Sequence, residues 1–99
     1  MTSAEKWNLP VSYGDLTQSD RRSVREQYAR EQGGKCRHCG GDLWGPAKGP
    51  AGRVQIEHRL FPESFFRHPI HLHHSHKTGL TIGAVHSRCN AYLWQYRGE

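Results

Sequence analysis

The segment 71–90 constrains the fold of this chain more than any other part of its sequence. It places a cluster of histidines before a Thr78-Gly79 turn, and a short apolar run after that turn. Short runs of this kind on either side of a glycine-containing turn are typical of a β-hairpin. We therefore predict two antiparallel strands, over 69–74 and 80–85.

A helix is predicted on each side of this hairpin. The first begins at Thr17 or Ser19, whose hydroxyl can cap it, and runs to about Gln32, where a Gly-Gly pair ends it. The second covers 87–96 and ends near the last residue of the sequence. Three of its apolar side chains are expected to be buried, namely Leu93, Trp94 and Tyr96.

The other segments are predicted to be less regular. Residues 1–16 lack a helical period and are expected to form an extended arm before a single domain over 17–99. Residues 40–53 are rich in Gly and Pro, which predicts a loop, and 54–56 is expected to form a short strand. Four side chains are expected to fill the core, namely Leu60, Phe61, Phe65 and Phe66.

The composition limits how much of the fold a hydrophobic core can stabilise. The chain has 99 residues, of which 34% are hydrophobic, and its mean hydropathy is −0.86. A domain this small commonly needs a further staple, such as a metal. Its net charge of +5 and pI of about 9.5 suit a polyanionic partner, although a solvated basic surface is the alternative. We interpret the arginines of the first helix as such a solvated face, namely Arg21, Arg22, Arg25 and Arg30.

The sequence contains no signal for a membrane. No run approaches the roughly 18 apolar residues of a membrane span. The segment 1–9 has no apolar signal-peptide core. We expect a cytoplasmic protein that has no membrane partner.

Three cysteines and one histidine have the spacing of a structural metal site. Cys36 and Cys39 form a C-x-x-C pair, and His86 and Cys89 form an H-x-x-C pair. Two such pairs complete a tetrahedral site for one zinc ion per chain. The odd number of cysteines argues against a disulfide framework. The alternatives are unrelated buried thiols, or His76 as the fourth ligand in place of His86.

His73, His74 and Asn90 are the residue types that metal-dependent phosphodiester hydrolysis needs. A neutral imidazole can activate water, and a second imidazole with an amide oxygen can hold a divalent cation. Adjacent residues of an ideal strand point to opposite faces, so the two histidines share a site only if the strand ends or bends there. Asn90 directly follows the expected zinc ligand Cys89, which would fix its direction.

The same residues resemble the HNH, or ββα-metal, endonuclease family. The histidine-rich strand, the Thr-Gly turn, the Gly-apolar strand and the ending H-S-R-C-N over 86–90 are similar to the phage recombination endonuclease VII branch and to small phage HNH proteins. The knuckle G-G-K-C-R-H-C-G over 33–40 fits the same pattern. The resemblance covers roughly 17–97 and is most specific over 71–90. It implies an α+β fold, a zinc-stapled ββα-metal domain with a preceding helix and an extended N-terminal arm.

The resemblance also implies roles for the site residues. His74 would be the general base that activates water, and His73 and Asn90 would hold a catalytic cation. His73 stands where many relatives place an Asp, so Mn²⁺, Co²⁺ or Ni²⁺ would compete better with Mg²⁺ than in those relatives. Thr81 stands near the middle Asn of many HNH motifs, so the sequence leaves open how His74 is oriented.

A second register exists within the same resemblance. The segment 56–62, I-E-H-R-L-F-P, also resembles the Asp-His-x-x-Pro opening of many HNH sites, and it would make His58 the base. We prefer the His73-His74 register because the turn, the second strand and the Cys-Asn pair follow it at close spacing.

We therefore expect a metal-dependent DNA endonuclease or nickase that acts as a monomer, with duplex DNA as its partner. The alternatives are a zinc-stabilised nucleic-acid-binding module without catalysis and a metal-storage protein, in which the Cys-Asn ending would have no role. The resemblance implies a phage source and work beside phage packaging or DNA-processing proteins. Contacts to phosphate are expected from five residues, namely Arg59, His71, His76, Lys77 and Arg88.

Overall fold

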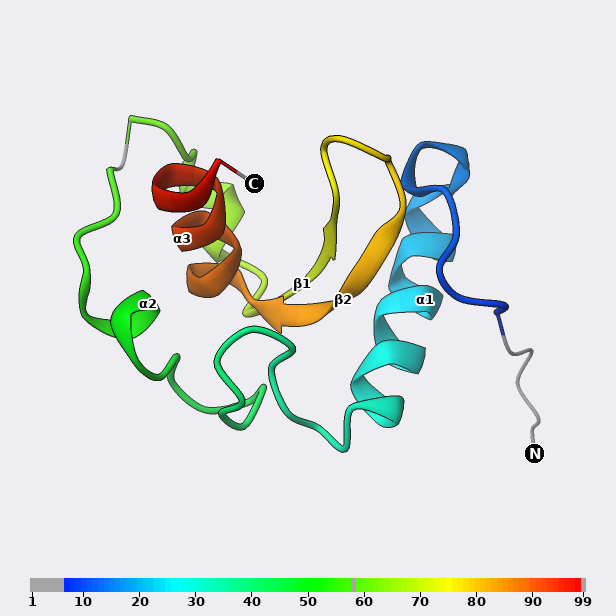
Figure 1. Ribbon diagram of the computed structural model, residues 1–99, viewed down its shortest axis with the longest axis horizontal. Coiled ribbons are helices and arrows are strands. Elements are labelled where there is room, and N and C mark those ends of the chain that lie inside the picture. Colours follow the sequence, from blue (N-terminus) through cyan, green and yellow to red (C-terminus); the bar gives the residue numbers. More distant parts are fainter. Residues whose placement is uncertain (1–6, 58, 99) are drawn as a thin grey trace.

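Two helices flank a two-stranded antiparallel sheet in the computed structural model, which describes residues 7–57 and 59–98 (Figure 1). Helix α1 packs against the hairpin, and α3 continues directly from the second strand. The described part of the chain is therefore a small α+β fold. In chain order its elements are the 3₁₀ turn η1 (Tyr13–Asp15), α1 (Gln18–Glu31), α2 (Pro50–Arg53), the 3₁₀ turn η2 (Glu63–Phe66), β1 (Ile70–His74), β2 (Thr81–His86) and α3 (Ser87–Arg97).

Helix α1 begins and ends where the sequence predicts. The Thr17 hydroxyl accepts a hydrogen bond from the Asp20 backbone N–H, and the Asp20 carboxylate accepts one from the Thr17 N–H, both at 3.1 Å. This reciprocal capping box satisfies donors that the first turn leaves unpaired. Gly33 and Gly34 follow the helix with φ of 67° and 77°, a region that glycine adopts without steric cost. They turn the chain toward the knuckle.

The predicted hairpin is confirmed, and it contains one irregularity. His73 pairs with Gly83, but the next residue, His74, pairs with Thr81, so β2 contributes one extra residue, Ile82, between the two pairs. A bulge of this kind breaks the strict alternation of side chains along a strand. The irregularity falls between the two histidines that the sequence analysis required to share a site.

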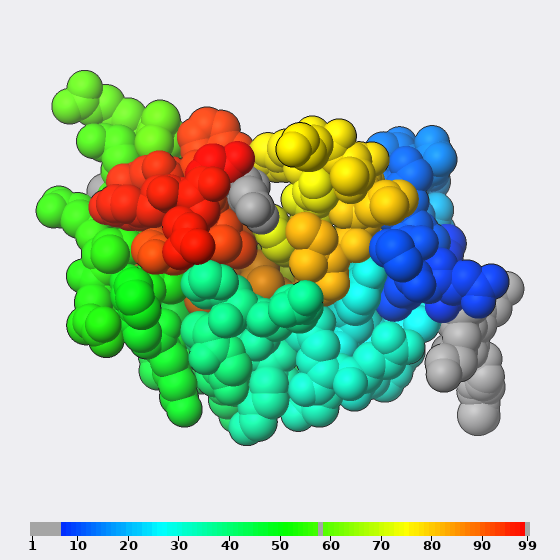
Figure 2. All heavy atoms as spheres, in the orientation of Figure 1, coloured from blue at the N-terminus to red at the C-terminus, as the bar shows by residue number. Residues whose placement is uncertain are grey.

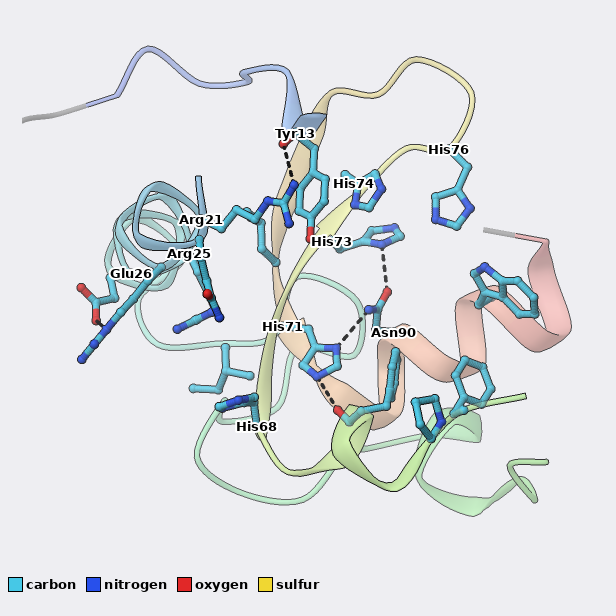
Figure 3. Close-up of a pocket in the computed structure, with 18 of the residues that line it drawn as sticks. Tyr13, Arg21, Arg25, Glu26, His68, His71, His73, His74, His76 and Asn90 are labelled. Atoms are coloured by element: carbon cyan, nitrogen blue, oxygen red, sulfur yellow. Dashed lines mark hydrogen bonds and ion pairs between the residues drawn. The ribbon is translucent and has the colours of Figure 1, made fainter. Parts of the chain in front are cut away.

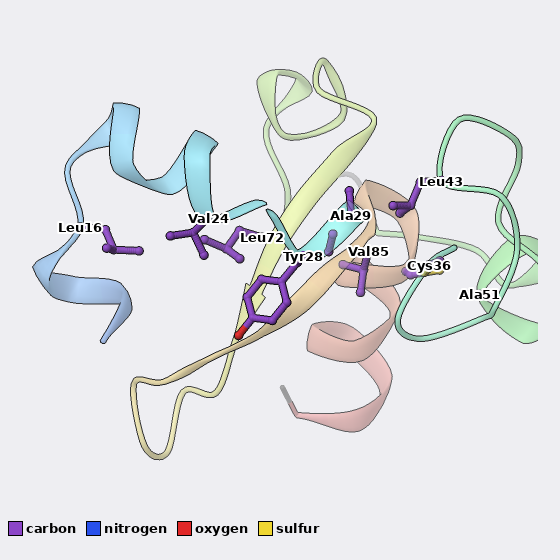
Figure 4. Close-up of a cluster of buried hydrophobic side chains, with 11 residues drawn as sticks. Leu16, Val24, Tyr28, Ala29, Cys36, Leu43, Ala51, Leu72 and Val85 are labelled. Carbon is purple, nitrogen blue, oxygen red and sulfur yellow. The ribbon is translucent and has the colours of Figure 1, made fainter. Parts of the chain in front are cut away.

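The main core lies between α1 and the hairpin and extends to the knuckle (Figure 4). Val24 of α1, Leu43 of the knuckle region and Val85 of β2 are fully buried in it. Leu72 reaches this cluster from β1, so alternation along the strand turns its neighbours toward the opposite face. The apolar face of the hairpin therefore meets α1, and its histidine face is left for the site.

A smaller cluster packs α3 against the segment before β1. Its buried members are Ile56, Phe61 and Ala91. The predictions that Leu60, Trp94 and Tyr96 are buried are wrong, because their exposed fractions are 47%, 45% and 48%. The buried residues of α3 all belong to its first turns, which meet the sheet, whereas its second half projects away from it.

The strand predicted over 54–56 does not form, and the hairpin is the only sheet among the described residues. The backbone of this segment is satisfied instead by side chains of α3. The Val54 carbonyl accepts a hydrogen bond from Arg88, and the Gln55 carbonyl accepts one from the Tyr96 hydroxyl at 2.6 Å. The segment consequently runs alongside α3 in an irregular conformation.

The loop predicted over 40–53 ends in a short helix instead of remaining irregular throughout. Helix α2 starts with Pro50 at its first position, where the missing N–H of proline has no cost. Its Ala51 is fully buried in the main core. This turn ties the long connection to the body of the domain.

The N-terminal segment is attached to the domain from Trp7 onward. The Trp7 backbone exchanges two hydrogen bonds with the Gln27 side chain of α1, at 2.7 and 3.0 Å. The Val11 backbone N–H donates to the Thr81 hydroxyl at 3.0 Å, and its carbonyl accepts from the Thr81 N–H at 2.9 Å. These contacts bring Tyr13 beside the hairpin. The part of the predicted arm over 1–6 lies outside the described residues.

Helix α1, with 14 residues, is the longest helix of the described ranges. Across 7–57 and 59–98, no helix combines the length and the apolar character that crossing a bilayer requires.

Truncating the core should destabilise the domain in proportion to burial. We expect Leu43→Ala to lower the free energy of unfolding by about 2–5 kcal/mol, because a fully buried leucine leaves a cavity. Urea denaturation of the zinc-loaded protein measures this change. The matched variant Leu80→Ala, at a side chain that is 41% exposed, should cost less than about 0.5 kcal/mol. Equal losses in the two variants would contradict this placement of the core.

Candidate metal centre and active site

The C-x-x-C and H-x-x-C pairs converge on one point, as their spacing predicts. The ligand atoms of Cys36, Cys39, His86 and Cys89 all lie within 4.8 Å of one another. His86 Nδ1 is 3.4 Å from the Cys39 sulfur and 3.5 Å from the Cys89 sulfur. In a tetrahedral zinc site, bond lengths of about 2.0–2.3 Å put neighbouring ligand atoms roughly 3.5 Å apart. The cluster therefore fits a metal ion such as zinc.

The surroundings of the cluster fix its ligands. His86 Nε2 donates to the Asp42 carbonyl at 2.7 Å, so in the neutral ring the lone pair belongs to Nδ1, the atom that faces the sulfurs. Backbone N–H groups of Gly41 and Lys48 point to the Cys39 sulfur, each at 3.4 Å. These two contacts hold the Cys39 sulfur in place beside the other ligand atoms.

The charge state of the cysteines points the same way. A hydrogen bond from the Cys89 thiol lowers the pKa of Cys36 to about 4, and backbone N–H groups add to the effect against the opposing effect of burial. The same bond and burial raise the pKa of Cys89. Cys36 therefore loses its proton more readily than Cys89, and a bound cation would favour the deprotonated form of both.

A groove opens on the face of β1 opposite the main core. Figure 2 shows the molecule hollowed between α3, in red, and the turn of the hairpin, in yellow. We call it the histidine groove. Side chains of α1, η2, β1 and α3 line it, together with Tyr13 of the N-terminal segment. The polar and ionisable side chains on which its chemistry would depend are Tyr13, Arg21, Arg25, His68, His71, His73, His74, His76 and Asn90.

Hydrogen bonds connect three of these side chains into one chain (Figure 3). His71 Nε2 donates to the Phe65 carbonyl at 2.7 Å, so its Nδ1 accepts from the Asn90 amide nitrogen at 3.1 Å. The Asn90 amide oxygen then accepts from His73 Nδ1 at 3.2 Å. A backbone carbonyl therefore fixes the tautomer of His71, the orientation of the Asn90 amide and the direction of the bond to His73.

Asn90 is held in place from two directions. It follows Cys89 in the first turn of α3, so a metal held by the cysteine cluster would fix its backbone. The bonds to His71 and His73 fix its side chain. The sequence analysis expected His71 to contact phosphate, but its two ring nitrogens are occupied by the Phe65 carbonyl and by Asn90.

The bulge brings His74 into the same groove as His73 (Figure 3). The His74 ring stacks on Tyr13, with 3.8 Å between ring centroids and 10° between planes, and His76 lies 5.0 Å away. Burial lowers the pKa of His74, and the neighbouring positive charges of His76, His73 and Arg21 lower it further. The ring is therefore neutral at neutral pH, as a general base must be.

Tyr13, and not Thr81, orients the His74 ring. The Thr81 hydroxyl is occupied by the Tyr28 hydroxyl at 2.9 Å and by the Val11 N–H at 3.0 Å, inside the core. The orientation of His74 comes instead from the ring of Tyr13, which no motif in the sequence could indicate.

The predicted site residues divide into two groups. One group lines the groove, namely His71, His73, His74, His76 and Asn90. The arginine and lysine side chains predicted to contact phosphate form the other group, and they do not line it. Arg59 and Lys77 are exposed elsewhere, and Arg88 is half-buried and donates to the backbone of the segment before η2. The alternative base, His58, lies outside the described residues. Side chains from the first part of the chain also line the groove and were not predicted as site residues, among them Tyr13, Arg21 and Arg25.

Comparisons of this chain with protein-family models, with curated proteins and with solved structures found no match. The geometry of the metal cluster and of the groove is therefore what supports a function for this chain.

The metal cluster should hold one zinc ion per chain and should be required for folding. We expect Cys89→Ser to lose the zinc and the cooperative unfolding transition, because such a site contributes on the order of 10 kcal/mol of apparent folding free energy. Metal analysis and circular dichroism measure both properties. His38→Ala is the matched control, because His38 lies within the same knuckle but outside the ligand cluster. Zinc retained in Cys89→Ser, or lost in His38→Ala, would contradict the ligand assignment.

Proposed function

We propose that this chain is a metal-dependent DNA endonuclease or nickase of the HNH, or ββα-metal, type. His74 acts as general base, His73 and Asn90 hold one catalytic divalent cation, and the cysteine cluster holds a structural zinc. The observation that carries the proposal is the position of His74 in the same groove as a His73–Asn90 pair whose ligand atoms are 3.2 Å apart.

That separation supports a shared cation. Two neighbouring ligands of an octahedral cation at about 2.1 Å lie roughly 3 Å apart. Cation binding at His73 Nδ1 requires the ring proton to be on Nε2, so the hydrogen bond to Asn90 and the cation exclude each other. The donors are one imidazole and one amide oxygen, with no carboxylate, which favours Mn²⁺, Co²⁺ or Ni²⁺ relative to Mg²⁺.

His74 accounts for the proton that hydrolysis removes from the attacking water. His74 removes a proton from a water molecule as the water oxygen bonds to phosphorus, and the bond between phosphorus and the leaving sugar oxygen breaks. The leaving oxygen takes a proton from solvent, and His74 later returns its own proton to solvent. The cation, when bound, neutralises charge on the scissile phosphate. Tyr13 limits the rotation of the His74 ring by stacking on it.

Removing the base should slow cleavage strongly without changing the fold. We expect zinc-loaded wild type with Mn²⁺ to convert supercoiled plasmid to open circles. His74→Ala should be slower by about 10²–10⁴-fold, because general base catalysis contributes that much. His58→Ala, which removes the alternative base, should cut like wild type. If His74→Ala cuts and His58→Ala does not, the register is wrong.

A chain that binds DNA but cuts it under no divalent cation would be a zinc-stabilised binding module. The His73–Asn90 hydrogen bond favours that alternative, because it pairs with each other the two atoms that the proposed cation would bind. The same plasmid assay across Mg²⁺, Mn²⁺, Co²⁺ and Ni²⁺ separates the two functions.

Replacing a neutral ligand by an anionic one should change which cation supports cleavage. We expect His73→Asp to lower the Mg²⁺ concentration for half-maximal nicking on the order of tenfold, because a carboxylate favours a hard cation. Nicking rates are measured over a Mg²⁺ series and a Ni²⁺ series. For each protein they give the ratio of the Mg²⁺ to the Ni²⁺ concentration at half-maximal nicking. An unchanged ratio would mean that residue 73 does not bind the catalytic cation.

A further inference from the structure

We propose that Arg21 and Arg25 of α1 form the phosphate-binding wall of the histidine groove and hold the backbone of a nucleic acid there. The inference deepens the proposed function and rests on it for the identity of the groove. It replaces the interpretation of these arginines as a solvated face.

Arg21 and Arg25 are four residues apart, so they share one face of α1, and both line the groove opposite Asn90 (Figure 3). Both are half-buried, whereas Arg30, near the end of the same helix, is exposed and lies outside the groove. One helix therefore carries arginines in two different environments.

The positive charge of this wall is uncompensated among the described residues. Within 7–57 and 59–98, the ion pairs are Arg22 with Glu26 and Arg59 with Glu57, so neither Arg21 nor Arg25 is neutralised by a carboxylate there. Glu26 is the one carboxylate among the described groove residues, and its partner is Arg22. The wall thus presents two uncompensated guanidinium groups, which complement an anion.

The Arg21 side chain is already partly withdrawn from solvent. Its guanidinium lies 4.1 Å from the centre of the Tyr13 ring and donates one long hydrogen bond, of 3.5 Å, to the Tyr13 carbonyl, whereas its Nε is buried with no hydrogen-bond partner. A buried donor without an acceptor is costly, and the group has already lost part of its hydration. An incoming phosphate oxygen therefore displaces less water from Arg21 than from an exposed arginine.

The stack also relates this wall to the proposed base. In Figure 3 the Tyr13 ring lies between the Arg21 guanidinium and the His74 imidazole. A phosphate held by Arg21 is consequently held close to His74. Trp94 of α3 and Phe61, whose ring contacts it, also line the groove and carry no charge, so the backbone of a bound strand should face the arginines of α1.

The test measures binding separately from cleavage. Zinc-loaded protein without any added divalent cation is titrated into fluorescein-labelled DNA at several salt concentrations, and the anisotropy gives the affinity. We expect Arg21→Ala and Arg25→Ala each to weaken binding by roughly tenfold and to reduce the slope of log affinity against log salt by about 0.9, the value for one phosphate contact.

Arg30→Ala is the matched control and should bind like wild type. Arg21→Lys, which keeps the charge but loses the planar fork, should fall between wild type and Arg21→Ala. Zinc content and circular dichroism identify any variant that fails to fold, and the Arg25→Ala slope then provides the test. Equal losses in Arg30→Ala and the groove variants, or an unchanged salt slope, would overturn the proposal.

The outcomes separate this inference from the nuclease proposal. Variant-dependent binding without cleavage by wild type supports the phosphate wall and removes the enzyme. Cleavage by wild type with normal binding in both groove variants supports the nuclease proposal and contradicts phosphate binding by Arg21 and Arg25. If inorganic phosphate binds through these arginines but DNA does not, the assignment to nucleic acid is wrong.

Discussion

The Cys36–Cys39–His86–Cys89 cluster is the constraint on which the rest of this small domain depends. It joins the knuckle after α1 to the junction between β2 and α3, segments that are about half the chain apart. With 34% hydrophobic residues, the core alone is thin, so a cross-link at this position stabilises the junction at which the elements meet. The Asp42 carbonyl and the backbone N–H groups around the sulfurs hold the four ligand atoms in an arrangement that could bind a metal such as zinc.

The position of the groove follows from this junction. The cluster sets the start of α3, and Asn90 comes one residue after its last ligand. The hairpin supplies the histidines from a strand whose other face is used by the core. The proposed chemistry then needs only the bulge between His73 and His74, which brings a candidate base and a candidate cation ligand to one side.

Local signals in the sequence were sufficient to predict much of this arrangement. The Thr17 cap, the Thr78-Gly79 turn and the metal-ligand spacing are short-range patterns, and the structure bears them out. The remainder depended on long-range contacts. Tyr13 reaches His74 because the N-terminal segment pairs with β2, some 70 residues away, and the segment 54–56 remains irregular because α3 satisfies its backbone.

The measurement that tests the central claim most directly is the location of a second metal in the zinc-loaded protein. Crystals soaked in Mn²⁺ and measured at the manganese absorption edge should show one manganese peak bonded to His73 and Asn90, separate from the zinc in the cysteine cluster. The same soak of Asn90→Ala should show no manganese there. Manganese absent from the groove of the wild type, or unaffected by the substitution, would contradict the account.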